Sequence, residues 1–303
     1  MRIAEQMRGI LRLLFAATIL HASPAVSADP ARSTVIQDDD EDDGPSVSSK
    51  PTSPKTMTET LFSPLLASGW RVEFGTRALA VPKVLGDNAI QASLGFTYNI
   101  VWNDTVFLTS ERGLGINAFQ ARGVFGQADR FVAGIAANYD DRAGIARSQS
   151  QLRSLDVRQR NAVHALGFAE YRNSNWRVWS EVSSYIDRRN GHVFSLGSEY
   201  AIPVTNKWTF LLSGGLSYSD AAHMRETYGI PAAAAVQFGA SPYRLSAGFS
   251  DASLSAQIEY KADNHWTWSL TAGETFLLGQ AAKSPRVETR SQPFMSAAVK
   301  YKF

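Results

Sequence analysis

The closing segment of this chain, residues 295–303, has the alternating pattern of an amphipathic β-strand. One face carries Met295, Ala297, Val299, Tyr301 and Phe303, and the other carries Ser296, Ala298, Lys300 and Lys302. Successive side chains of a strand point to opposite faces, so in a membrane barrel one set meets lipid and the other meets a polar lumen. A terminal aromatic residue after such a strand is typical of bacterial outer-membrane barrels, although a soluble β-sandwich could end in the same way. We interpret Val299, Tyr301 and Phe303 as a signal for the barrel-assembly machinery.

The same two-residue period recurs along the chain. It is clearest at residues 70–75, 92–102, 208–219, 254–261 and 266–271. Short turn signals lie near residues 103–104, 126–129, 173–175, 203–207 and 263–265, and longer links lie near 82–88, 112–114, 142–161, 188–191, 220–250 and 279–291. Their alternation predicts an all-β fold, a transmembrane antiparallel β-barrel of about twelve strands over residues 67–303, with short periplasmic turns and long outer loops. If residues 105–124 form one strand and not two, the barrel has ten strands.

The N-terminus predicts export. Three arginines precede a short apolar run, residues 13–20, and small residues end at Ala28. This pattern is typical of a secretory signal peptide over residues 1–28. Because no apolar run reaches the roughly 20 residues that a membrane helix needs, any membrane span should consist of strands. The predicted location is the outer membrane of a Gram-negative cell.

Residues 29–66 differ in composition from the rest of the chain. They hold three basic and eight acidic residues, including the run from Asp38 to Asp43, and are rich in proline and serine, whereas residues 67–303 hold 24 basic and 19 acidic residues. Such a segment buries too little apolar area to offset its ordering entropy, so we predict a disordered periplasmic leader. It could be a solvated spacer, a tether or a reservoir for divalent ions. The basic barrel should adjoin outer-membrane lipids and lipopolysaccharide, and export argues against nucleic acid as a partner.

The tryptophans of the chain all lie near predicted short turns or at the start of the first strand. They are Trp70, Trp102, Trp176, Trp179, Trp208, Trp266 and Trp268. Indole rings favour the boundary between apolar and polar membrane layers. We therefore predict a one-sided girdle at the periplasmic membrane interface.

The predicted inward positions carry both signs of charge. They include Arg71, Glu73, Arg77, Glu259, Lys261, Lys300 and Lys302, together with Glu111 and Glu170. In a small barrel such charges can pair and fill the lumen, or they can form the constriction of a narrow pore.

The sequence gives little indication of catalysis. There is no cysteine, the mature histidines His164, His192, His223 and His265 stand outside any recognisable nucleophile motif, and we find no zinc-spaced ligands or phosphate-binding loop. A triad could still assemble from distant strands. We predict no catalytic residue, no metal and no cofactor, and we interpret Gly113 and Gly115 as turn or bulge glycines.

Three segments resemble one protein family. They are FLTSERGLGINAF at 107–119, HMRETYGIPAAAAVQF at 223–238, and HWTWSLTAGETFLLGQAAKSPRV at 265–287 with the closing strand. In this order they resemble the MltA-interacting protein family of outer-membrane barrels, also called MipA/OmpV, over most of residues 69–303. The chain departs from the family pattern in a short first hairpin, VPKVLGDN, and in a basic loop at 142–161.

This resemblance implies a non-enzymatic scaffold. The namesake of the family bridges a lytic transglycosylase and a bifunctional peptidoglycan synthase, so enzymes of these two classes are the partners implied here. The alternative is a small channel or an adhesion barrel that acts through its lumen or outer loops.

Overall fold

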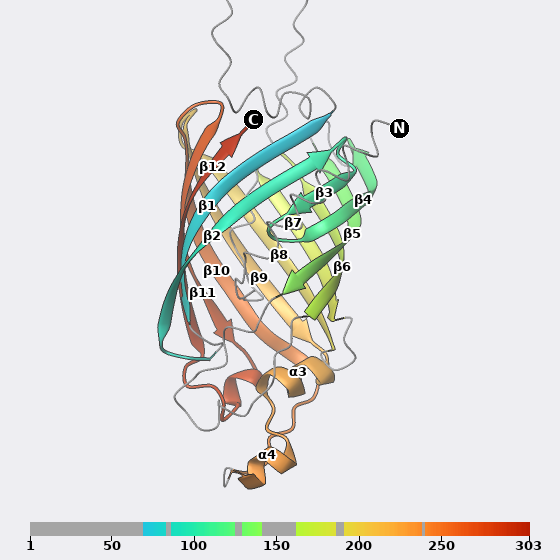
Figure 1. The fold of residues 1–303 in the computed structure, drawn as a ribbon, viewed down its shortest axis with the longest axis vertical. Helices are drawn as coiled ribbons and strands as arrows, with labels where there is room; N and C mark the ends of the chain where they lie inside the picture. The colour runs from blue at the N-terminus through green and yellow to red at the C-terminus, as the bar shows by residue number, and fades with distance from the viewer. Residues whose placement is uncertain (1–68, 83–85, 125–128, 141–161, 186–190, 238–239) are drawn as a thin grey trace, which may run out of the picture.

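The computed structural model describes residues 69–82, 86–124, 129–140, 162–185, 191–237 and 240–303. Within them the chain forms a closed antiparallel barrel in which each strand pairs with its neighbours in sequence and β1 pairs with β12 (Figure 1). Its strands are β1 (Trp70–Pro82), β2 (Ile90–Trp102), β3 (Val106–Thr109), β4 (Gly113–Arg122), β5 (Arg130–Asp140), β6 (Ala162–Arg172), β7 (Trp176–Tyr185), β8 (His192–Pro203), β9 (Trp208–Ser219), β10 (Gly248–Lys261), β11 (Trp266–Leu277) and β12 (Ser291–Lys302). The predicted signal peptide and leader lie outside the described residues.

The prediction of twelve strands is confirmed, and the uncertain segment at 105–124 forms two of them. The tight turn after β3 begins where the Thr109 hydroxyl accepts a hydrogen bond from the Arg112 amide, at 3.0 Å. Gly113 follows with a φ of +75°, a conformation that glycine adopts without the strain that a Cβ would bring. The turn interpretation of Gly113 is therefore confirmed.

The barrel is apolar outside and mostly polar inside. On β10, Leu254 on the outer face is 62% exposed, whereas Ser255 and Gln257 on the inner face are 5% and 6% exposed. The neighbouring strands repeat this alternation. An apolar band around a polar interior is the pattern of a barrel that stands in lipid.

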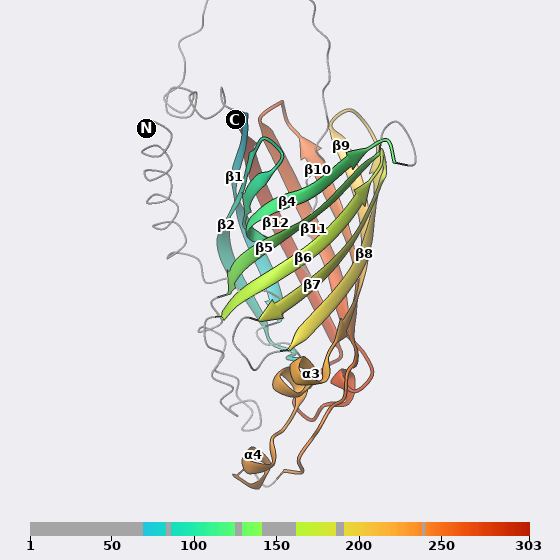
Figure 2. The same ribbon diagram turned by 90° about the vertical axis from the view of Figure 1, so that its right-hand side faces the viewer.

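The two ends of the barrel differ. Short turns gather at the end where β1 begins and β12 ends, and the longer connections gather at the other end (Figure 2). The connection between β9 and β10 contains α3 (Ala221–Tyr228) and α4 (Ala232–Gln237), and η1 (Ala281–Lys283) follows β11. Neither α-helix is long and apolar enough to cross a membrane, judged over the described residues.

Helix α3 packs over the long-loop end of the barrel. Asp220 caps it by accepting a hydrogen bond from the His223 amide at 2.7 Å. Met224 and Tyr228 of α3 then pack in a buried apolar cluster with Leu245, Leu277 and Ala281. Burial raises the pKa of the Tyr228 phenol, and the Asp251 carboxylate raises it further.

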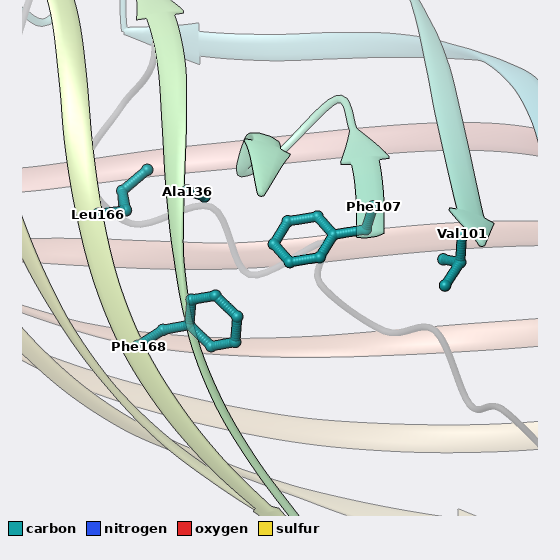
Figure 3. Packing of buried hydrophobic residues seen from close by; sticks show 5 residues of the cluster. All are labelled: Val101, Phe107, Ala136, Leu166 and Phe168. Atoms are coloured by element: carbon teal, nitrogen blue, oxygen red, sulfur yellow. The ribbon is translucent and has the colours of Figure 1, made fainter. Parts of the chain in front are cut away.

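A second apolar cluster lies inside the barrel wall. It consists of Val101, Phe107, Ala136, Leu166 and Phe168, and the close-up shows the Phe107 and Phe168 rings turned toward each other (Figure 3). The two ring centroids are 5.7 Å apart in an edge-to-face arrangement. Gly115 leaves room for this packing, because a Cβ there would lie 2.3 Å from the Phe107 ring. The short β3–β4 hairpin is thus anchored by aromatic packing on the lumen side.

We predict that Gly113→Ala destabilises the barrel by about 1 to 3 kcal/mol. A Cβ at this position would lie 2.2 Å from the Ala137 carbonyl oxygen, and the positive φ adds strain. The check is the urea midpoint of unfolding in detergent micelles. Gly167→Ala is the matched control, because a Cβ there meets no described atom within 4 Å. Equal midpoints for the two variants would contradict the prediction.

Candidate functional site

The lumen contains a cluster of charges centred on Glu170 of β6. The Glu170 carboxylate is buried and accepts hydrogen bonds from Arg112 at 3.2 Å and from Arg177 at 3.1 Å. Arg172, two residues farther along β6, also donates to this carboxylate. One carboxylate therefore holds three guanidinium groups, and a buried charge is tolerated when it is paired and hydrogen-bonded in this way.

Two further carboxylates balance the arginines. Glu181 of β7 lies 3.5 Å from Arg112, and Glu199 of β8 lies 4.0 Å from Arg177. The Ser213 hydroxyl on β9 donates to Glu199 at 3.1 Å. The network thus links the β3–β4 turn with four consecutive strands across one side of the lumen. Of its charged members, sequence reasoning singled out only Glu170, although the inward parity of the strands could have indicated the others.

Aromatic rings cover two of these arginines. The Arg112 guanidinium lies 4.2 Å from the centroid of the Phe168 ring, and that of Arg177 lies 5.0 Å from the Trp179 ring. Trp179 therefore shares the inward face with Arg177, and a Cβ on Gly197 would lie 2.2 Å from its ring. The prediction that Trp179 belongs to the membrane-interface girdle is wrong. Its proximity to a turn was a correct observation, but its odd position on β7 points it into the lumen.

The other predicted lumen charges lie mainly on β1, β10 and β12. Arg71 pairs with Asp104 of the turn after β2, and Glu73 accepts a hydrogen bond from Asn99 at 3.4 Å. Glu259 is buried and attracted by Lys300 and Lys261. Lys302 faces Glu73 in the strand register and is exposed at the rim.

A cavity of about 50 Å³ lies among these side chains. Strands β1, β2 and β12 and the β3–β4 turn contribute to its lining. The lining includes Glu73, Arg77, Thr97, Asn99, Glu111 and Lys300. The Thr97 hydroxyl is buried and has no hydrogen-bond partner among the described residues. The lumen therefore has a filled side, around Glu170, and a side with free volume.

Tryptophans mark the outer face at the short-turn end. Trp70, Trp102, Trp176, Trp208, Trp266 and Trp268 share the face of the exposed apolar residues. The Trp70 and Trp102 rings are 6.0 Å apart, and Trp176 and Trp208 pack on Tyr200 and Tyr260 at 4.7 and 4.5 Å. Their place in a membrane interface stays a prediction.

The C-terminal residues close the barrel with aromatic contacts. Tyr301 lies 4.9 Å from Trp266 and 4.8 Å from Phe303, measured between ring centroids. The Phe303 amide donates to the Val72 carbonyl at 3.0 Å, which joins the end of the chain to β1. A recognition role for Val299, Tyr301 and Phe303 in barrel assembly stays a prediction.

Side chains fix the exposed turns at the same end. Asp263 accepts hydrogen bonds from the His265 and Trp266 amides, each at 2.8 Å. The amide of Trp266 and then that of His265 lower the pKa of the Asp263 carboxyl. The carboxylate therefore supports the turn at all pH values above its ordinary pKa, and this support is lost as the pH falls through the depressed value. Asn173 holds its turn through weaker contacts to the amides of Asn175 and Trp176.

The structure brings one histidine and one serine together. The Ser184 hydroxyl and the His192 Nδ1 atom are 2.6 Å apart on neighbouring strands. Within the described ranges, no group of three or more histidine, aspartate and glutamate side chains is arranged to hold a metal ion. The absence of catalytic, metal and cofactor sites remains a prediction.

We predict that Glu170→Gln lowers the free energy of unfolding by about 3 kcal/mol or more, because it leaves three neighbouring guanidinium groups without their shared carboxylate. Urea unfolding of the folded barrel in micelles measures this change. Asp104→Asn serves as the control, since it removes a partly exposed partner of Arg71 and should cost about 1 kcal/mol or less. If Glu170→Gln costs no more than the control, the cluster is not the electrostatic centre of the lumen.

Two solved structures and one family model are similar to the chain. Among solved structures, the NanC porin is similar, with 8% sequence identity and a TM-score of 0.44 over 76% of this chain and 100% of that chain. An outer-membrane channel from Pseudomonas putida F1 is similar with 8% identity and a TM-score of 0.41, over 77% of this chain and 95% of that chain. No curated protein sequence matches the chain.

The family comparison covers most of the described barrel. The model of the family described as MltA-interacting protein MipA matches residues 74–303. This range contains β1 from Phe74 onward and the eleven strands that follow it. It agrees with a barrel that is apolar on the outside and located in the bacterial outer membrane. The chain therefore belongs to the MltA-interacting protein (MipA) family of outer-membrane β-barrel proteins.

Proposed function

We propose that this protein is a non-enzymatic scaffold that holds peptidoglycan-remodelling enzymes, a lytic transglycosylase first among them, at the periplasmic side of the outer membrane. The name of its family, MltA-interacting protein, describes binding to such an enzyme. The observation that carries the proposal is the short-turn end of the barrel, where exposed turns are held in fixed shapes by their own side chains.

The shape of these turns favours a docking surface. Asp263 and Asn173 each accept hydrogen bonds from two backbone amides of their own turn, and Thr205 does so in the turn before β9. A surface that is already ordered loses little conformational entropy when a partner binds. Short turns face the periplasm in bacterial barrels, which is the compartment that contains peptidoglycan.

Charge on the rim supports the same role. Lys207 and Lys302 are exposed at this end, and the Lys207 ammonium donates to the Ala262 carbonyl of the next turn at 3.2 Å. Exposed pairs contribute only about 0.2 to 1 kcal/mol each and are screened by salt. Electrostatic attraction at the rim would therefore speed recruitment of a partner more than it would strengthen the complex.

The filled half of the lumen agrees with a scaffold better than with a wide pore. The network around Glu170 and the apolar cluster of Phe107 and Phe168 occupy one side of the interior. Helix α3 packs over the long-loop end. Paired charges inside a small barrel stiffen the wall that carries the rim.

We predict that photo-crosslinkers placed at Ser174 and Asn264 capture lytic transglycosylases or peptidoglycan synthases in intact cells. Both residues are exposed at the tips of short turns, and neighbouring residues make the hydrogen bonds that shape those turns. Captured proteins are identified by mass spectrometry and scored by enrichment over other envelope proteins.

The matched control carries the crosslinker at Ala233 of α4, an exposed position at the long-loop end of the same barrel. A scaffold of periplasmic enzymes should yield these adducts from Ser174 and Asn264 and not from Ala233. The proposal fails if all three positions capture the same proteins, or if the rim positions capture no enzyme that acts on peptidoglycan.

The acidic leader gives a second test of the proposal. Deleting residues 29–66, which carry eight acidic and three basic residues, should weaken recovery of the partner while the barrel still folds. Replacing the acidic run from Asp38 to Asp43 by the corresponding amides removes the charge of the leader and keeps its length. The variant therefore tells an effect of charge from an effect of length. Unchanged recovery of the partner in both variants would remove the leader from the mechanism, and the rim alone would carry it.

A further inference from the structure

A row of four arginines crosses the barrel wall at its short-turn end. Arg122 on β4 lies opposite Arg130 on β5, which in turn lies opposite Arg172 on β6. Arg172 lies opposite Arg177 on β7. The four strands are neighbours in the wall (Figure 2). We call these four residues the arginine row.

The arginine row faces the lumen. Arg130 shares the face of β5 with Val132 and Ala136, which pack in the apolar cluster inside the barrel. Residues directly opposite one another on paired strands point to the same face. Strands β4 and β6 end at Arg122 and Arg172, and β5 begins at Arg130. The row therefore lies on the inner side of the mouth at the short-turn end.

Such a row is unfavourable unless anions compensate it. Like charges directly opposite one another on neighbouring strands destabilise their pairing. On the β6–β7 side, the buried Glu170 carboxylate pairs with both Arg172 and Arg177. This half of the row thus has a carboxylate of its own in the wall.

The β4–β5 side has weaker compensation in the wall. The Arg130 guanidinium donates to the neutral Gln120 side chain at 2.9 Å. It also lies 3.8 Å from the Asp104 carboxylate, which pairs with Arg71 as well. Arg130 therefore depends on a neutral amide and on a carboxylate shared with another arginine, and a further anion would stabilise this side.

Positive charge is also the charge that the mouth presents to solvent. Arg122 and Lys302 are exposed, whereas the carboxylates of Glu170, Glu199 and Glu259 are buried beneath them. Attraction between exposed charges extends over the Debye length, about 8 Å at physiological salt. An anion that approaches from the short-turn end therefore meets cations first.

The leader of this chain carries the complementary charge and joins the barrel at the same mouth. Residues 38–43 are six consecutive acidic residues. Strand β1 begins at Trp70, at the short-turn end. The Asn103 amide donates to the Gly69 carbonyl at 2.9 Å, which fixes the point where the leader meets the rim.

The segment between the acidic run and β1 is long enough to cross the mouth. It comprises the 25 residues 44–68, and a flexible chain of this length spans roughly 25 to 30 Å. Twelve strands about 4.8 Å apart and tilted by about 40° close into a cylinder about 24 Å in diameter. The acidic run can therefore reach β4 and β5 from the start of β1.

Two features favour this segment over other anions. The arginine row points into the lumen, whereas membrane lipids contact the outer face of the wall. A tethered segment also binds within its own molecule, at an effective concentration that is in the millimolar range for short flexible linkers.

We propose that the acidic run Asp38–Asp43 docks on the β4–β5 side of the arginine row, at Arg122 and Arg130, inside the mouth of its own barrel. Its carboxylates accept charge-assisted hydrogen bonds from the guanidinium groups. The leader then lies across the mouth, from β1 to β4 and β5. This contact forms within one chain and needs no partner, so it is independent of the scaffold function proposed above.

The test measures the distance between two spin labels in the purified barrel with its leader, in detergent micelles. The chain contains no cysteine, so labels attach only at Gly44→Cys, beside the acidic run, and at Ser174→Cys, an exposed turn residue near Arg172. We expect a narrow distribution of short distances by pulsed electron paramagnetic resonance. A free linker gives a broad distribution that reflects its span of roughly 25 to 30 Å, and this result would overturn the proposal.

Variants on each side of the contact identify its partners. Replacing residues 38–43 by the corresponding amides should broaden the distribution to that of a free linker, and so should Arg122→Gln combined with Arg130→Gln. The first variant changes no residue of the barrel wall, so a folding defect of the second cannot hide the result. A distribution that stays narrow in the amide variant would overturn the proposal.

Lys207→Gln is the matched control, because Lys207 is an exposed cation at the same end and lies outside the arginine row. It should leave the narrow distribution unchanged. Broadening equal to that of the double arginine variant would indicate general attraction to the rim and would overturn the assignment to Arg122 and Arg130.

Salt tells charge pairing from apolar contact. In about 1 M NaCl the Debye length falls to about 3 Å, so the distribution should broaden. A distribution that stays narrow would overturn the electrostatic contact. Because these measurements contain no partner enzyme, their failure would leave the scaffold proposal standing, and failure of the crosslinking in cells would leave this contact standing.

Discussion

Closure of the backbone ladder is the constraint on which the rest of this structure depends. In a lipid layer, strands are stable only if their amide and carbonyl groups find partners in neighbouring strands. The chain achieves this by pairing β1 with β12 along eight registered positions, from Glu73 opposite Lys302 to Ala80 opposite Met295. The terminal amide of Phe303 adds a bond to Val72 beyond that register. Closure also gives each strand one face toward lipid and one face toward the lumen. The alternation of apolar and polar residues follows these two faces.

The interior follows from this closure. Inward positions of a small barrel are crowded, so their charges must meet partners across strands. Glu170 meets three arginines on one side, while Glu259 and the lysines at the β12 seam form a looser group on the other. A stiff half and a half with free volume thus coexist in one lumen. The stiff half supports the rim that we propose as a docking surface, and the other half contains the cavity.

Much of the fold could be predicted from local pattern. The period of two along the chain and the alternation of short and long connections predict the number of strands. They also predict that the first strand begins and the last strand ends on the same side of the barrel. The arginines around Glu170 could not be predicted as its partners, because cross-strand register decides which inward residues meet. Trp179 illustrates the same limit: its place near a turn is visible in the sequence, but its facing depends on one residue of register. The segment that contains Asp220 and Tyr228 has no strand pattern, so the sequence predicts a long loop there. Helix α3 was therefore missed.

The seam between β1 and β12 has a consequence for chain connectivity. The order of strands around the barrel is continuous, and β1 begins at the same end of the barrel at which β12 ends. The covalent break in the chain is therefore topologically arbitrary: a circular permutant that joins residue 303 to residue 69 and opens in a long connection would keep every ladder. Such a molecule would show whether the barrel still forms when Phe303 is joined to a further residue.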